Sequence, residues 1–425
     1  MSDGYARRVV DDELDELIEG LPAIALEGAR GVGKTSTAAA RAQTAYRLED
    51  AVERGIVVGN TARLLDGEPP ILIDEWQYLP ESWNLVRRAV DEGAAPGRFL
   101  LTGSTSLEAP PTHTGAGRIV SVRMRPLSLA ERGLEKPHVR VASLLSGERP
   151  EVGGSTSMTL EDYVSEIVGS GFPGLRGLTG RALRTQLDGY LERVVDRDFE
   201  EAGHSIRNPA ALRRWLTAYA AASSTTASFE TIADAGSGAA GRRPPRSTTI
   251  TYRDVLERIW VLDPLTAWLP SRNRLRRLVA PPKHQLVDPA LGARLLGVDA
   301  DALLDAAPVG PRIPRDGPLV GALFESLVTQ SVRVYAQAAE ARVGHLRTAS
   351  GEHEVDLIVE RADGRVVAIE VKLARTVSDD DVRHLRWLAS RLGDELLDAV
   401  VVTTGPAAYR RSDGIAVVPA ALLGP

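Results

Sequence analysis

Cysteine is absent from this chain of 425 residues, and so is any long apolar run. The absence of cysteine excludes disulfide bonds, thiolate zinc sites and cysteine nucleophiles, and it fits a reducing compartment. A membrane-spanning helix needs about 18 apolar residues in succession. The charged N-terminal segment also lacks the apolar core of a signal peptide. We therefore expect a cytoplasmic protein with no membrane partner.

Aromatic residues and lysines are scarce. Aromatic side chains make up 5% of the chain, so the core is expected to be mainly aliphatic. The only lysines among 51 basic residues are Lys34, Lys136, Lys283 and Lys372, which makes a lysine within a motif informative. The net charge of −6 excludes a general polycation, so any contact with nucleic acid requires local basic patches.

Residues 28–35 match the phosphate-loop pattern G-x-x-x-x-G-K-[ST]. Its glycines let backbone N–H groups converge on phosphate oxygens, and the following helix adds the partial positive charge of its N-terminus. An apolar strand at 23–27 and a helix over about 35–43 give the loop its expected context. Lys34 is expected to reach the β- and γ-phosphates of ATP. The predicted nucleotide contacts are Gly28, Ala29, Arg30, Gly31, Val32, Gly33, Lys34, Thr35 and Ser36.

Two adjacent carboxylates follow the apolar strand at 71–73. Asp74 is expected to hold Mg²⁺ together with the Thr35 hydroxyl, and Glu75 to orient and deprotonate the attacking water. Carboxylates at the carboxyl end of a strand lie beside the phosphate loop in a doubly wound sheet. Thr102, the last residue of the strand at 98–102, is expected to sense the γ-phosphate, with Ser104 just after the strand as second choice.

Arg118 opens a further strand at 118–124, after a loop rich in glycine and proline. It is a candidate for stabilising phosphate charge, either within the chain or from a neighbouring subunit of a homo-oligomer. A structural surface arginine is an equally good interpretation. Together, apolar strands that alternate with helical segments predict a parallel sheet covered on both faces.

A second constellation lies near the C-terminus. The segment 354–360 alternates in polarity, an Asp-Gly turn follows it, and 366–372 is an otherwise apolar return strand, which together predict a hairpin. Counting outward from the turn places Asp356 nearly opposite Glu370, with Lys372 on the same face as Glu370. The D-x(13)-E-x-K spacing resembles the PD-(D/E)XK nuclease core, except that Val355 replaces the usual proline. The resemblance implies Mg²⁺ ligands at Asp356, Glu370 and the upstream Glu325, and a catalytic Lys372. The alternative is a salt-bridge cluster on a purely structural fold.

The region between these two parts is mostly helical. Residues 211–222, 228–235 and 250–262 predict three short helices, and 262–268 with 285–287 predict the strands of a wing. Basic residues gather in this region, as phosphate contacts to DNA require: Arg242, Arg243, Arg246, Arg253, Arg258, Arg272, Arg274, Arg276, Arg277 and Lys283. A helical lid with solvated arginines is the alternative to a winged-helix DNA contact.

Taken together, the chain resembles a prokaryotic family that joins an AAA-like ATPase domain to a C-terminal region known as domain of unknown function 4143. The resemblance rests on the order and spacing of segments 28–35, 74–77, 101–104, 117–118, 126–128, 171–174, 190–198, 287–291 and 354–372. It implies an α/β P-loop ATPase of the additional-strand class, a winged-helix connector and a PD-(D/E)XK-like end. One departure is Gly31, where the family pattern has glutamine.

The expected domains are an ATPase domain at 1–146, a connector at 158–304 and a nuclease-like domain at 315–425. The leading hypothesis is an ATP-hydrolysing switch that acts on nucleic acid, with ATP and Mg²⁺ as cofactors. A regulatory ATPase whose C-terminal module binds DNA or a protein without cutting is the second hypothesis. A scaffold that binds ATP but hydrolyses it poorly is the third.

Overall fold

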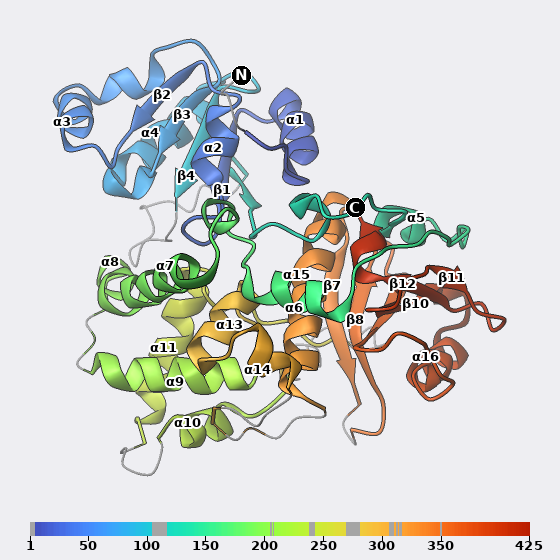
Figure 1. Cartoon of the computed structure of the whole chain (residues 1–425). Helices are drawn as coiled ribbons and strands as arrows, with labels where there is room; N and C mark the ends of the chain where they lie inside the picture. Colours follow the sequence, from blue (N-terminus) through green and yellow to red (C-terminus); the bar gives the residue numbers. More distant parts are fainter. Residues whose placement is uncertain are drawn as a thin grey trace.

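A five-stranded parallel sheet forms the N-terminal part of the chain (Figure 1). The computed structural model describes residues 5–103, 117–204, 206, 208–237, 243–268, 281–305, 310–311, 313, 317–348 and 351–425. The sheet order is β2-β3-β4-β1-β5, so β4 lies between β1, which leads into the phosphate loop, and β3, which ends in Asp74. This intervening strand is the feature expected of the additional-strand class. The strands are β1 (Ala23–Glu27), β2 (Thr44–Arg47), β3 (Ile71–Asp74), β4 (Phe99–Gly103) and β5 (Val120–Arg123).

Helices cover both faces of this sheet, as the apolar strands predict. Alternate side chains of β1 enter different cores: Ile24 and Leu26 pack with α1 and α2, whereas Ala23 and Ala25 pack with α3 and α4. The helix after the phosphate loop is shorter than expected and ends at Ala39. The covering helices are α1 (Val10–Gly20), α2 (Lys34–Ala39), α3 (Ala51–Gly59) and α4 (Glu81–Asp91), with short turns η1 (Thr61–Leu65), η2 (Trp76–Tyr78) and η3 (Ala130–Arg132).

The connector is helical and lies below the ATPase sheet in the view of Figure 1. The three helices expected at 211–222, 228–235 and 250–262 are present as α9, α10 and α11. The two expected wing segments meet in one isolated antiparallel bridge, Leu262 with Leu286, and a second bridge joins Leu265 to Lys283, just before the expected segment 285–287. The connector elements are α6 (Leu160–Val168), η4 (Pro173–Leu175), α7 (Gly180–Arg193), the π-helical η5 (Val194–Asp198), α8 (Phe199–Glu201), α9 (Pro209–Ala221), α10 (Phe229–Ser237), α11 (Arg246–Arg258), α13 (Pro289–Leu296) and α14 (Ala300–Leu304).

The C-terminal part is a mixed sheet of order β11-β12-β10-β9-β8-β7. Strands β7, β8 and β9 form an antiparallel meander, and β10 runs parallel to β9. The expected hairpin is present, but the sequence patterns missed β7. The elements are α15 (Leu319–Ala338), β7 (Arg342–Arg347), β8 (Glu354–Glu360), β9 (Val366–Lys372), α16 (Arg383–Leu392), η6 (Gly393–Glu395), β10 (Leu396–Thr403), β11 (Tyr409–Arg410), β12 (Ala416–Pro419), η7 (Ala420–Leu422) and β13 (Leu423–Gly424).

The segment after the ATPase sheet turns toward the C-terminal sheet. Strand β6 (Val139–Arg140) pairs with β13, and α5 (Val141–Leu145) packs against α15, β9 and β10. Residues 139–145, which we expected within the first domain, therefore contact the C-terminal part of the chain. One hydrophobic core continues from Leu14 in α1 through the connector to Leu422. None of the helices within the described ranges is long and apolar enough to cross a membrane.

Candidate nucleotide site and carboxylate cluster

The phosphate loop has the backbone geometry that its glycines permit. Gly28, Gly31 and Gly33 have φ angles of 152°, 83° and 100°, a region that other residues rarely adopt. A side chain at Gly28 is also excluded by space, since a Cβ there would lie 2.2 Å from the carbonyl oxygen of Met124. The loop leads directly into α2, whose first residue is Lys34.

Lys34 is folded back into its own loop. Its ammonium group donates hydrogen bonds to the carbonyl oxygens of Gly28 at 2.9 Å and Ala29 at 3.0 Å, and its side chain is buried. Burial lowers the pKa of Lys34 to about 8, and the positive charge of Arg30 adds to this decrease, while the Glu75 carboxylate opposes it. The loop thus holds a cation whose charge phosphate oxygens would stabilise.

Three oxygens from three elements meet beside Lys34. Thr35 Oγ1 donates a 2.8 Å hydrogen bond to Asp74 Oδ1, and Thr102 Oγ1 donates to the same carboxylate oxygen. Hydroxyl and carboxylate oxygens are the ligands that Mg²⁺ prefers. The residues present therefore fit a magnesium ion between the phosphate loop and the end of β3.

Glu75 follows Asp74 in a constrained conformation. Its φ angle of 53° is left-handed, which a residue other than glycine adopts only when its surroundings enforce it. Its N–H donates to Thr102 Oγ1 at 3.2 Å, and its carboxylate accepts a hydrogen bond from Gln77 Nε2. Thr102 thereby fixes both acidic residues at once. Ser104, the second choice for this position, lies outside the described residues.

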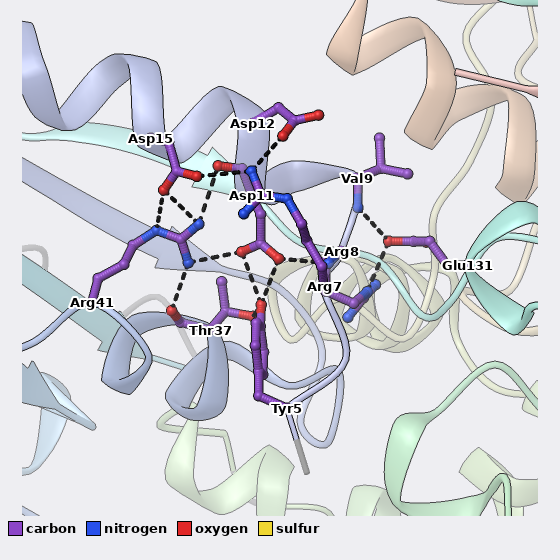
Figure 2. A network of polar contacts seen from close by, with 10 residues as sticks. All are labelled: Tyr5, Arg7, Arg8, Val9, Asp11, Asp12, Asp15, Thr37, Arg41 and Glu131. Carbon is purple, nitrogen blue, oxygen red and sulfur yellow. Dashed lines mark hydrogen bonds and ion pairs between the residues drawn. The ribbon is translucent and has the colours of Figure 1, made fainter. Parts of the chain in front are cut away.

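The N-terminal segment supports the phosphate loop from outside, and the sequence motifs gave no sign of it. Arg8 donates to the carbonyl oxygen of Val32 at 2.9 Å and forms a buried ion pair with Glu131 at 2.8 Å. Figure 2 shows the neighbouring network, in which Asp11 contacts Tyr5 and Arg41. Arg8 and Asp11 are therefore positioning residues for the loop and α2.

The connector also contacts the phosphate loop directly. Arg30 forms ion pairs with Asp198 at 3.2 Å and Glu201 at 3.5 Å, next to the π-helical turn η5. A Cβ on Gly31 would lie 3.7 Å from Phe172 Cδ1, and one on Gly33 would lie 3.7 Å from Pro173 Cγ. The phosphate loop thus forms ion pairs with one part of the connector and lies close to a second part.

Asp288 holds the segment of Phe172 in place. Its carboxylate accepts hydrogen bonds from the Gly171 N–H at 2.6 Å and Ser170 Oγ at 3.1 Å. The same carboxylate accepts from the Ala290 N–H at 2.8 Å and so caps α13. Two motifs that are more than a hundred residues apart in the sequence, 171–174 and 287–291, therefore meet behind the phosphate loop.

Arg118 does not lie with these residues. It precedes β5, which runs parallel to β1 with Val120 opposite Ile24, whereas the phosphate loop follows the other end of β1. Its guanidinium group pairs with Asp91 at 2.6 Å, at the end of α4. The expected role for Arg118 at the phosphates of its own chain is therefore wrong. The parallel direction of the strands places Arg118 at the end of the sheet opposite the phosphate loop.

The C-terminal carboxylates converge as expected, but around a lysine. Lys283 Nζ lies 2.9 Å from Glu325 Oε1 in α15 and 3.0 Å from Asp356 Oδ1 in β8. It also lies 3.0 Å from Glu354 Oε1. The Lys283 side chain is 1% exposed, so the expectation that it contacts DNA on a wing is wrong.

The other half of the hairpin carries its own ion pair. Lys372 Nζ lies 3.0 Å from Glu370 Oε2, and Asp356 Oδ2 accepts a 2.8 Å hydrogen bond from the Val371 N–H. The antiparallel register pairs Leu357 with Ile369, and one further step along both strands places Asp356 beside Glu370. The sequence therefore predicted correctly that these side chains share one end of the hairpin.

Burial governs the protonation of this cluster. Burial and the Asp356 charge raise the pKa of Glu325 to about 8, and they raise the pKa of Glu370 well above its usual value. Burial would also raise the pKa of Asp356, but the ammonium groups of Lys283 and Lys372 outweigh it and lower that pKa. The negative charge of these carboxylates is thus neutralised partly by the two lysines and partly by protonation.

The expected Mg²⁺ ligands of the C-terminal part do not form a metal site. Within the described ranges, no group of three or more His, Cys, Asp or Glu residues could hold a metal ion. The physical reason is that the ammonium group of Lys283 occupies the space between Glu325 and Asp356. These residues do not fit Mg²⁺ in this arrangement. Glu325 and Asp356 are therefore corrected from metal ligands to partners of the buried Lys283, and Glu370 is corrected to a partner of Lys372.

Three of the connector arginines that the structure describes are paired with acids. Arg243 lies 3.2 Å from Asp234, and Arg253 lies 2.9 Å from Asp254. Arg246 is the most exposed of the group, at 84%, and lies 4.0 Å from Glu230. Arg242, Arg272, Arg274, Arg276 and Arg277 lie outside the described residues. Contact with DNA and the winged helix therefore remain predictions.

Comparisons with known proteins match three consecutive parts of the chain. Residues 21–132 match an AAA domain, residues 160–302 match a domain of unknown function (DUF8612), and residues 320–423 match a domain of unknown function (DUF4143). Two curated relatives, uncharacterized protein Mb2031c of Mycobacterium bovis and uncharacterized protein Rv2008c of Mycobacterium tuberculosis, are each 26% identical. The match covers 97% of this chain and 83% of each relative.

Two solved structures are also similar in part. The Walker-type ATPase PABY2304 of Pyrococcus abyssi is 18% identical with a TM-score of 0.40, covering 67% of this chain and 94% of that one. The ORC2 protein of Aeropyrum pernix, solved as ADPNP–ADP complexes, is 15% identical with a TM-score of 0.31, covering 72% and 97%. The domain matches confirm the combination that the motifs indicate: the chain joins an AAA domain to a C-terminal domain of unknown function (DUF4143).

Proposed function

We propose that this protein binds ATP with Mg²⁺ and hydrolyses it. The observation that carries the proposal is the hydrogen bond from Thr35 to Asp74, which joins a complete phosphate loop to the acidic end of β3. The matched AAA domain spans both motifs and supports the same activity. Mg²⁺, held by Thr35 and Asp74, would neutralise phosphate charge.

The roles of the chain's own residues follow from their positions. Lys34 would exchange its hydrogen bonds to the Gly28 and Ala29 carbonyls for bonds to phosphate oxygens. Glu75, held by Thr102 and Gln77, would orient the attacking water and accept its proton. The backbone N–H groups of the loop would bind the remaining phosphate oxygens.

Nucleotide binding would be transmitted to the connector. Arg30 belongs to the phosphate loop yet pairs with Asp198, and Phe172 lies close enough to Gly31 that an added Cβ would touch its ring. A triphosphate next to Arg30 would compete with Asp198 for its guanidinium group, because both are anions. The contact between loop and connector therefore supports a switch whose state depends on the bound nucleotide.

The C-terminal module is proposed to have a nuclease-like hairpin, with nucleic acid as the target of the switch. Its support is the D-x(13)-E-x-K spacing and the convergence of Asp356, Glu370 and Lys372 at one end of the hairpin. The second candidate is a module that binds DNA or a protein without cutting. One observation favours it: Lys283 fills the space between the expected metal ligands.

Steady-state hydrolysis of ATP tests the proposed activity. Wild-type protein is expected to release phosphate from ATP in the presence of Mg²⁺. Glu75→Gln is expected to lose about 100-fold or more in kcat because it lacks the base. Glu81→Gln, an exposed acid at the start of α4, is the matched control and should retain activity. Absence of turnover in folded wild-type protein would refute hydrolysis, and stimulation by added DNA would support the nucleic-acid target.

A further inference from the structure

The ammonium group of Lys283 is surrounded by carboxylates from two elements. Glu325 comes from α15, and Glu354 and Asp356 come from β8. Their three oxygens lie 2.9, 3.0 and 3.0 Å from Nζ. An ammonium group has three N–H donors, so it can donate one hydrogen bond to each carboxylate. Donors and acceptors are matched one to one around a single positive centre.

The backbone of Lys283 is fixed on both sides. Its N–H donates to the carbonyl oxygen of Leu265 at 2.9 Å, and the Leu265 N–H donates to the carbonyl oxygen of Lys283 at 2.9 Å. The next residue, His284, donates its N–H to the carbonyl oxygen of Thr225 at 2.8 Å. The lysine is therefore part of the connector's own paired segments and does not reach the cluster from a free loop.

Electrostatics oppose a second cation at the same place. Asp356 and Lys283 are both almost fully buried, and breaking such a pair leaves an uncompensated charge. A divalent metal would need oxygens at about 2.0–2.1 Å for Mg²⁺. The oxygens instead point at Nζ, and a metal among them would be repelled by the ammonium group. One cation can occupy the centre of this cluster.

We propose that Lys283 takes the place of a divalent metal in the nuclease-like cluster, so that the C-terminal module is a metal-independent, non-cutting element fastened to the connector. The buried ion pairs join residues more than forty positions apart. Through these ion pairs, a movement of the connector would also move the C-terminal sheet. This inference rests on the nuclease-like hairpin of the proposed function and is independent of ATP hydrolysis.

Binding of Mn²⁺ to nucleotide-free full-length protein tests the proposal, with free Mn²⁺ measured by electron paramagnetic resonance. The single variant Asp356→Asn is expected to bind as much Mn²⁺ as the wild-type protein. Lys283→Ala is expected to gain one Mn²⁺ per chain, because three carboxylates lose their cation. The gain should disappear again in Lys283→Ala/Asp356→Asn. Lys136→Ala, at an exposed lysine outside the cluster, is the control and should gain nothing.

Two results would overturn the proposal. The first is a wild-type Mn²⁺ site that Asp356→Asn removes, since the cluster would then hold metal and lysine together. The second is a folded Lys283→Ala protein, judged by circular dichroism, that gains no Mn²⁺. If Lys283→Ala does not fold, the comparison of wild type with Asp356→Asn still decides. Because no nucleotide is present, failure here is distinct from failure of the proposed ATPase activity.

Discussion

Thr102 and Asp74 are joined by a hydrogen bond from the threonine hydroxyl to the carboxylate oxygen that also accepts the bond from Thr35. Both side chains are buried, at 0% and 4% exposure. Thr102 also accepts the N–H of Glu75 at 3.2 Å. The two acidic residues of the site are thus held by a strand that lies between them and β1.

Replacing Thr102 with valine tests this arrangement. Thr102→Val keeps the shape but leaves the partly buried N–H of Glu75 without its acceptor, which costs about 1 kcal/mol of stability or more. We expect kcat for ATP hydrolysis to fall by about tenfold or more, because Glu75 loses its orientation. Thr102→Ser keeps the hydroxyl and should stay close to wild type. Equal loss in both variants would argue for a packing role alone.

The pKa of Lys34, lowered to about 8 by burial, predicts how ATP binding depends on pH. Below pH 8 the free protein already carries the charge that phosphates need. Above pH 8 the free lysine loses its proton, so ATP must bind together with a proton. Affinity is then expected to weaken by up to about tenfold per pH unit.

Fluorescent-nucleotide titrations from neutral pH to well above pH 8 would measure this decrease. Lys34→Arg is the matched variant, because arginine keeps its charge over this range. Its weaker affinity should not depend on pH. A wild-type affinity that stays constant across pH 8 would contradict the account of Lys34.

Two neighbouring arginines provide a matched pair for the support of the phosphate loop. Arg8 is buried with Glu131 and donates to Val32, whereas Arg7 is exposed and pairs with Asp12 at the surface. Arg8→Ala removes the charged partner of the buried Glu131 carboxylate, which keeps hydrogen bonds from Val9 and Ser128, and is expected to destabilise the fold by about 3 kcal/mol. Arg7→Ala should change little.

Thermal unfolding of both variants, with and without ATP, separates stability from binding. Arg8→Ala should also raise the KM for ATP more than it lowers kcat, because the loop is misplaced rather than deprived of a reacting group. Similar unfolding temperatures for the two variants would show that Arg8 does not support the loop.

Asp288 and Asp299 allow a similar comparison in the connector. Both cap a helix, α13 and α14 respectively, so alanine at either position costs about 1 kcal/mol. Only Asp288 also holds Gly171 and Ser170 behind the phosphate loop. Asp288→Ala is therefore expected to weaken ATP binding about fivefold or more, within the usual range of coupling between sites. Equal ATP affinity in the two alanine variants would refute this link.

The sequence predicted the contiguous parts of the site and missed the long-range ones. The phosphate loop and Asp74 are local patterns whose residue types follow from their chemistry, so their position after buried strands was predictable. Arg8, Asp198 and Asp288 act through contacts with residues far away in the chain. Asp198 and Asp288 lie in segments that carry the family resemblance, but a local pattern does not say which distant residues they contact. Arg118 precedes a strand that was expected to run parallel to 23–27. The sequence alone could therefore have placed it at the end of the strands opposite the phosphate loop.

Lys283 shows the opposite difficulty. In the sequence it stands beside a group of arginines, and this neighbourhood favoured a basic surface. Its burial results from pairing between 262–265 and 283–286, which brings the side chain to α15 and β8. Strand β7 was missed because Arg342–Arg347 contains glycine, histidine and two arginines, which weaken the pattern of alternating polarity.

Calorimetric titration of ATP with Mg²⁺ into the purified protein is the most direct test of the nucleotide site. One ATP is expected to bind per wild-type chain, and Lys34→Ala should bind at least about tenfold more weakly, since it loses a charged hydrogen-bond donor to phosphate. Folded wild-type protein that takes up no nucleotide, or a Lys34→Ala variant with unchanged affinity, would contradict the account.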